Sequence, residues 1–142
     1  MKRILLFALV VLTLFAFSSC NLDDDGPNFN FVALRVLSAE VPDAFDLNET
    51  HKITVTYSLP DGCTTFRGFE IDNPDTTTRN VVVIGSQRTD LVCTQLTDTV
   101  EASFDFTVLF SDTYLFRFWT GEDENGEQQY LEIEVPVNDP TN

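Results

Sequence analysis

The sequence predicts an all-β fold, a two-sheet antiparallel β-sandwich of about seven strands. Three observations lead to it. From Asn28 onward apolar and polar residues alternate with the period of two that is typical of half-buried strands. Turn residues interrupt this alternation about every 8 to 15 positions. No segment of that region has the apolar spacing of an amphipathic helix. A jelly roll or a small barrel is the alternative architecture.

The first half of the domain predicts four strands, at residues 31–40, 51–59, 63–72 and 78–84. The second is the clearest, because Ile53, Val55 and Tyr57 alternate with polar residues. It ends at Pro60-Asp61-Gly62, a turn in which proline fixes φ and glycine permits a positive φ. The fourth contains residues 81–84, Val-Val-Val-Ile, which favours a strand that is covered on both sides or crosses an edge.

The second half predicts three more strands, at residues 100–109, 113–120 and 129–137. A shorter segment at residues 90–96 could add an eighth. Asn125-Gly126 between the last two strands is the strongest short signal for a hairpin. The final strand is expected to turn Leu131, Ile133 and Val135 inward.

This number of short strands in a domain spanning 29–137 fits an immunoglobulin-like sandwich, followed by a polar tail at 138–142. Tyr114 opens the penultimate strand and resembles a tyrosine corner, in which the hydroxyl binds backbone upstream. Cys63 opens the third strand, whereas antibody domains carry a cysteine inside the second. The expected likeness is therefore one of architecture and not of descent.

Residues 1–19 read as a cleaved signal peptide and not as part of the fold. Lys2 and Arg3 precede an apolar run at residues 4–17, and Ser18 and Ser19 supply the small residues of a cleavage site. The run is shorter than the roughly 20 residues that a membrane-spanning helix needs.

The junction Phe17-Ser18-Ser19-Cys20 resembles the lipobox of bacterial lipoproteins. The resemblance implies cleavage before Cys20 and a lipid anchor on that residue; a secretory signal with a stray cysteine is the alternative. Residues 23–25, Asp-Asp-Asp, resemble the acidic export signal of Bacteroidetes lipoproteins. This implies an outer-membrane lipoprotein that faces the outside of the cell, with residues 20–28 as tether. A purely solvated tether on a periplasm-facing protein is the other reading.

The cysteine count supports this interpretation. An exported protein with three cysteines has one left over, and the lipobox accounts for Cys20. Cys63 and Cys93 are then expected to form a disulfide, because export delivers them to an oxidising compartment. Free buried thiols remain an alternative, and a catalytic or metal role for the pair is disfavoured because the sequence holds no Cys-x-x-Cys and no neighbouring histidine.

Charge and residue types argue against several functions. Eight basic residues against 23 acidic ones, a net charge of −15, disfavour nucleic acid and a polybasic membrane patch. His51 is the only histidine, so neither a triad nor a histidine-based metal site is expected. Two pairs of acids stand two residues apart, Glu70 with Asp72 and Glu132 with Glu134, so each pair shares one face of its strand. We expect that face to be the solvent face, which argues against a catalytic carboxylate pair. Residues 122–127 lack the EF-hand spacing. We expect no enzyme activity, no cofactor and no metal.

Two kinds of surface site are candidates. Trp119 and Tyr130 fall out of phase with the core and could form a platform for a glycan or a protein, although cross-strand packing also explains them. Asp75-Thr76-Thr77 and Asp98-Thr99-Val100 resemble the O-glycosylation pattern of Bacteroidetes proteins, which implies modification at Thr76 and Thr99.

The domain as a whole also resembles a group of small lipoproteins of flavobacterial type. The shared features are the turn at 59–63, the cysteine at 93, and the segments 104–106, 114–119 and 121–126. That resemblance does not point to any particular activity. We expect a non-enzymatic, lipid-anchored envelope protein that acts as a binding or structural module. A glycan- or peptide-binding accessory of an uptake system and a small protein inhibitor are the alternatives.

Overall fold

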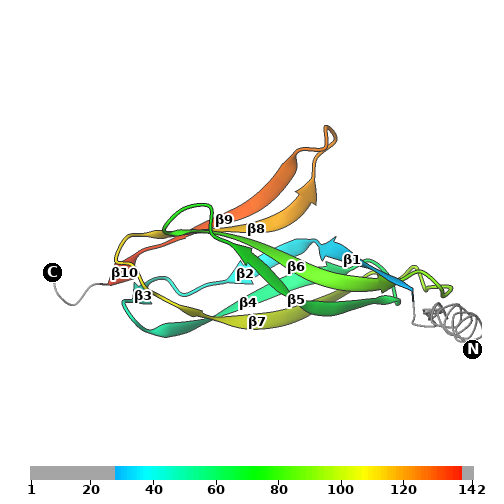
Figure 1. Cartoon of the computed structure of the whole chain (residues 1–142), viewed down its shortest axis with the longest axis horizontal. Helices are drawn as coiled ribbons and strands as arrows, with labels where there is room; N and C mark the ends of the chain where they lie inside the picture. The colour runs from blue at the N-terminus through cyan, green and yellow to red at the C-terminus, as the bar shows by residue number, and fades with distance from the viewer. Residues whose placement is uncertain (1–27, 139–142) are drawn as a thin grey trace, which may run out of the picture.

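A computed structural model describes residues 28–138, which form ten strands and no helix (Figure 1). The expectations for the signal peptide at 1–19, for Cys20 and for nearly all of the tether lie outside these residues. So does the tail expected at 138–142, except for Asn138, which ends the last strand instead. Within the described part, no helix is long and apolar enough to cross a membrane.

The larger sheet is built around one central strand. Its members are β1 (Phe29–Leu34), β5 (Thr64–Asp72), β6 (Thr78–Arg88), β8 (Tyr114–Glu122) and β9 (Gln128–Val135). Antiparallel β5 follows one edge of β6. The other edge is shared, because β1 pairs with the second half of β6 and β8 pairs in parallel with the first half. The β8–β9 hairpin projects from the body of the domain (Figure 1).

The second sheet is smaller and lies against the first. It contains β2 (Val36–Glu40), β4 (Thr50–Leu59) and β7 (Asp98–Thr107), all antiparallel. The chain passes from one sheet to the other at Arg35, between β1 and β2. A short parallel pair of β3 (Phe45–Asp46) and β10 (Val137–Asn138) closes the end opposite Asn28.

The core lies between the two sheets and is aromatic at the β3–β10 end. Phe45, Phe106, Tyr114 and Phe116 contact one another, with ring centroids 5.1 to 6.3 Å apart. Aliphatic residues fill the rest of the buried cluster: Leu34, Val36, Ile53, Val55, Val81, Val83, Val108 and Val135. The alternating pattern of the sequence therefore identified the inward faces correctly.

The β-sandwich class is confirmed, while several details of the prediction are wrong. The strand expected at 31–40 is two strands in two sheets, and the strand expected at 129–137 is interrupted at Pro136, which has no N–H to give to a ladder. Residues 45–46, which lie between two of the predicted strands, form β3. Residues 90–96 form a loop and no strand.

The expectation of purely antiparallel sheets is also wrong, since β6 with β8 and β3 with β10 are parallel. The reason for the first is the path of the chain. After β6 the chain crosses to the second sheet, returns along β7, and re-enters the first sheet as β8 in the direction of β6. Residues 81–84 lie in this central strand, with Val81 and Val83 fully buried.

Candidate functional site

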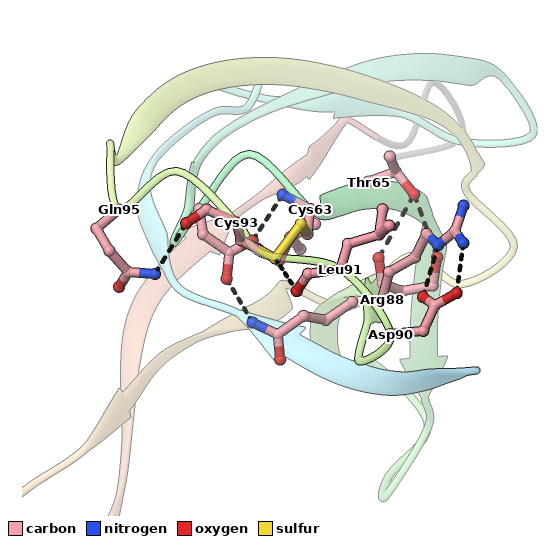
Figure 2. Close-up of a disulfide and its surroundings, with 11 residues drawn as sticks. Cys63, Thr65, Arg88, Asp90, Leu91, Cys93 and Gln95 are labelled. Carbon is pink, nitrogen blue, oxygen red and sulfur yellow. Dashed lines mark hydrogen bonds and ion pairs between the residues drawn. A yellow bond between two sulfur atoms is a disulfide. The ribbon is translucent and has the colours of Figure 1, made fainter. Parts of the chain in front are cut away.

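The predicted disulfide is present and fixes an irregular loop. Cys63, just before β5, and Cys93, in the loop between β6 and β7, are bonded with an S–S distance of 2.03 Å (Figure 2). Two backbone bonds hold the same region: Arg88 N–H donates to the Cys63 carbonyl at 3.2 Å, and Gly62 N–H donates to the Thr94 carbonyl at 3.1 Å. The loop at 89–97 is thus tied to the end of the sandwich although it has no strand of its own.

The turn before the disulfide is organised by Asp61. Its carboxylate accepts the Thr64 hydroxyl at 2.8 Å, the Cys63 N–H at 2.9 Å and the Gln87 side-chain amide at 2.5 Å. The hydrogen bond from Thr64 is the main cause that lowers the pKa of Asp61 below its ordinary value, and it outweighs the opposing effect of desolvation. The carboxylate is therefore held ionised as a structural acceptor.

Two other acids, Asp90 and Asp123, also have their pKa values lowered by hydrogen bonds within the protein. The guanidinium of Arg88 binds Asp90 at 2.6 and 2.9 Å (Figure 2) and lowers the pKa of that carboxyl. The N–H groups of Glu127 and Asn125 lower the pKa of Asp123, which closes the predicted Asn125-Gly126 hairpin. The expected hairpin turn at 122–127 is therefore confirmed.

Trp119 and Tyr130 lie directly opposite each other on the neighbouring strands β8 and β9. Both are partly buried. The Trp119 Nε1–H donates to the Gln128 side chain at 2.5 Å, and the Arg117 guanidinium lies 4.3 Å from the centre of the Tyr130 ring. Cross-strand packing thus accounts for part of their position, and a ligand role for this face stays a prediction.

A groove of about 300 Å³ adjoins the indole of Trp119. It lies where the chain passes from β1 to β2, and its other walls come from the end of β4 and from Thr97. The residues that line it include an aromatic residue, three with polar side chains and three apolar ones: Trp119, Arg35, Ser58, Thr97, Ala33, Leu34 and Pro60. Such a lining suits a hydroxylated ligand, which stacks on an aromatic ring and hydrogen bonds to polar side chains. Sequence reasoning missed all of it except Trp119, because the other residues come from distant segments.

His51 has neighbours that the sequence analysis did not expect. A nitrogen of His51 and carboxylate oxygens of Asp46 and Glu49 lie within 4.8 Å of one another. These are ligand types that bind zinc. However, His51 Nε2 accepts the Asp46 N–H at 3.1 Å, and the ring packs 4.9 Å from that of Phe45. Ligation through Nε2 would break the first of these contacts, so the geometry favours a role in closing the turn between β3 and β4.

The remaining predicted residues lie on the surface. Thr76 is exposed in the turn between β5 and β6, which the buried Arg79 holds by hydrogen bonds to the carbonyls of Asp75, Thr76 and Thr78. Thr99 is exposed near the start of β7. Both hydroxyls are accessible, and their glycosylation stays a prediction. The carboxylate pairs at 70 and 72 and at 132 and 134 face solvent as expected.

Residues 53–135 match the family model described as the ORF11 beta-sandwich domain. The matched segment begins within β4, ends with β9 and contains both bonded cysteines, Trp119 and Tyr130. No curated protein and no solved structure matched the sequence.

Proposed function

The chain belongs to the ORF11 beta-sandwich domain family, and from that premise we propose that it is a lipid-anchored protein of the cell envelope whose sandwich acts by binding and not by catalysis. One observation carries the anchor. The disulfide occupies Cys63 and Cys93, so Cys20 is the one cysteine of the three that remains for another purpose. It follows directly on an apolar segment and two serines.

The physical logic of the anchor is that acyl chains on one residue hold a soluble domain at a bilayer. Each buried methylene contributes about 0.8 kcal/mol, and more than one chain is needed for durable attachment. Lipidation of both the thiol and the new amino terminus of Cys20 would meet that need. The disulfide supports export as well, since disulfides persist in oxidising compartments.

A binding role is favoured by how the acids of the domain are used. The three carboxylates with lowered pKa values each accept hydrogen bonds within a turn or from a neighbouring arginine: Asp61, Asp90 and Asp123. These acids are therefore engaged in holding the fold. The groove beside Trp119, by contrast, is an open concave surface with both polar and apolar lining residues, which a ligand could enter.

The anchor is tested by growing cells that express the full chain with an alkyne analogue of palmitate. Label is expected on the wild type and is expected to vanish in Cys20→Ala. The matched control is the double variant Cys63→Ala/Cys93→Ala, which removes the other cysteines and should keep its label. Label that persists in Cys20→Ala would contradict the proposal.

The proposed orientation is outward display on the outer membrane, with a periplasm-facing anchor as the alternative. Protease treatment of intact cells separates the two, because only an outward-facing domain is within reach of the enzyme. We expect loss of the domain from intact cells, with a periplasmic protein in the same cells as an undigested control. Protection until the cells are lysed would favour the periplasmic orientation.

A second candidate is a glycan- or peptide-binding accessory, which the groove beside Trp119 favours. Its test is an array of glycans and peptides probed with the wild type, with Trp119→Ala and with Phe110→Ala. Phe110 is a matched control because it is an exposed aromatic residue in the loop between β7 and β8, where its N–H binds the Tyr114 hydroxyl, and it does not line the groove. Binding that is lost only in Trp119→Ala would support this face, whereas binding that survives that change would exclude it.

A further inference from the structure

We propose that the end of the sandwich nearest Asn28 rests on the lipid bilayer that holds the anchor, through a patch made of Phe29, Phe31, Leu91, Val92 and Leu96. This inference rests on the proposed lipidation of Cys20. It adds a second contact with the membrane, made by the folded domain itself. We call these five residues the apolar end patch.

All five side chains are exposed although they are large and apolar. Phe31 is 67% exposed, Leu96 is 77% exposed and Val92 is fully exposed. Phe29 and Phe31 alternate along β1 and therefore share the outer face of the larger sheet. Concentrated apolar exposure of this kind marks surfaces that contact a membrane or another protein.

The patch gathers at one end of the molecule. Thr89 N–H donates to the Asn28 carbonyl at 3.0 Å, which places the start of the 89–97 loop beside the start of β1. Figure 1 shows that loop next to the point where the described chain begins, and Figure 2 shows Leu91 beside the disulfide. The disulfide and the Gly62–Thr94 bond hold the loop there.

The short tether indicates that the lipid bilayer is what covers the apolar end patch. Only eight residues, 21–28, separate Cys20 from β1. Whatever their conformation, they reach at most about 29 Å, so Asn28 cannot be farther than that from the acylated residue. The end that carries the patch is therefore the end that the anchor keeps at the membrane, at a high effective concentration of lipid.

The charge distribution agrees with this placement. Residues 91–97 carry no charged side chain in a protein of net charge −15. The one acid at the start of the loop, Asp90, is paired with Arg88. The hairpin turn at 122–127, in contrast, carries four acids and projects away from the body. Charges are costly at a lipid boundary, and the loop of the patch largely lacks them.

The test uses the full lipoprotein inserted into preformed phosphatidylcholine vesicles, with tryptophan as a reporter of depth. Trp119 is the only native tryptophan, so a Trp119→Phe background leaves a single reporter at a chosen site. Val92→Trp places it in the patch. Leu109→Trp is the matched control, because Leu109 is 64% exposed and follows Val108, whose carbonyl accepts the Asn48 N–H in the turn after β3, at the opposite end. Bromine on the acyl chains quenches only tryptophan that reaches them.

We expect brominated lipid to reduce the Val92→Trp emission by about half and to leave Leu109→Trp nearly unchanged, as for apolar side chains that enter the headgroup–acyl boundary. Adding Phe29→Ser and Phe31→Ser should weaken the quenching about twofold or more, because both contribute apolar contact. These side chains are outside the core, so folding should be kept and is checked by circular dichroism.

Flotation of the vesicles separates this inference from the anchor. Protein that floats through Cys20 while Val92→Trp is quenched no more than Leu109→Trp keeps the anchor and overturns the docking. A blue-shifted Val92→Trp emission without quenching means that a second copy or another protein covers the patch, which also overturns it. Protein that does not float removes the anchor and the docking together.

Discussion

The phenol oxygen of Tyr114 accepts the backbone N–H of Phe110 at 3.1 Å. It also accepts the N–H of Leu109 at 3.2 Å, so one hydroxyl binds two successive amides of the loop before β8. The ring beneath it is fully buried against Phe45 and Phe106. The residue thus joins the aromatic core to the loop that returns the chain to the larger sheet.

Tyr114→Phe is expected to lower the free energy of unfolding by about 1–3 kcal/mol, because it removes the acceptor of two partly buried amides and leaves the ring in place. Urea unfolding at neutral pH measures the change. Tyr130→Phe is the control, since the Tyr130 ring packs under Arg117 without needing its hydroxyl. Equal midpoints for Tyr114→Phe and the wild type would mean that the corner contributes nothing.

Removal of the disulfide by Cys63→Ser/Cys93→Ser is expected to cost about 3–4 kcal/mol, because the bond closes a loop of about 30 residues in the unfolded chain. Urea unfolding of the oxidised wild type and of the double variant gives the difference. A reducing agent should bring the wild type to the level of the variant and leave the variant unchanged. Cys20→Ser serves as the control and should unfold like the wild type. A double variant as stable as the oxidised protein would contradict this role.

Local signals in the sequence predicted local structure well. Asn125-Gly126 predicted the hairpin, and Tyr114 predicted the tyrosine corner. Once Cys20 was assigned to the lipobox, the two cysteines that remained, Cys63 and Cys93, predicted the disulfide. Each depends on residues whose chemistry dictates the contact. The alternation of apolar residues likewise identified the core, since the period of two assigns each side chain to a face.

Relationships between distant segments could not be read in this way. The parallel pairing of β6 with β8 depends on the path through the second sheet, and alternation gives no strand direction. The groove beside Trp119 draws on Arg35, Ser58 and Thr97, which the sequence places far apart. The grouping of Asp46 and Glu49 around His51 needs a turn in which Asn48 has a positive φ of 66°. Nothing in the local pattern distinguished that turn from an ordinary polar loop.

Acid is expected to destabilise the domain, in part through Asp61. Its pKa in the folded state lies below the ordinary value of 3.8, so the stabilisation is complete above that value and is lost as the pH falls through the folded pKa. Asp90 and Asp123 act in the same direction. Urea midpoints should therefore fall as the pH is lowered below about 4.

Asp61→Asn tests the contribution of that residue. The variant should be less stable than the wild type at neutral pH and should lose less stability in acid, because the amide cannot ionise. Asp105→Asn is the control, since Asp105 forms only a solvent-exposed ion pair with Lys52 at 3.6 Å. If Asp61→Asn and the wild type show parallel pH profiles, Asp61 has no part in the acid response.

Gly85→Ala is expected to destabilise the domain by about 1–3 kcal/mol through overpacking. A Cβ at this position would lie 2.9 Å from Cδ1 of Leu34, which is fully buried where β1 pairs with β6. Urea unfolding of Gly85→Ala, of Leu34→Ala and of the double variant forms a cycle that isolates the contact. Because Leu34→Ala removes the atom that the new methyl group would strike, the double variant should lose less stability than the two single losses combined, by about 0.5 kcal/mol or more. Strictly additive losses would show that Gly85 is required for a reason other than its close approach to Leu34.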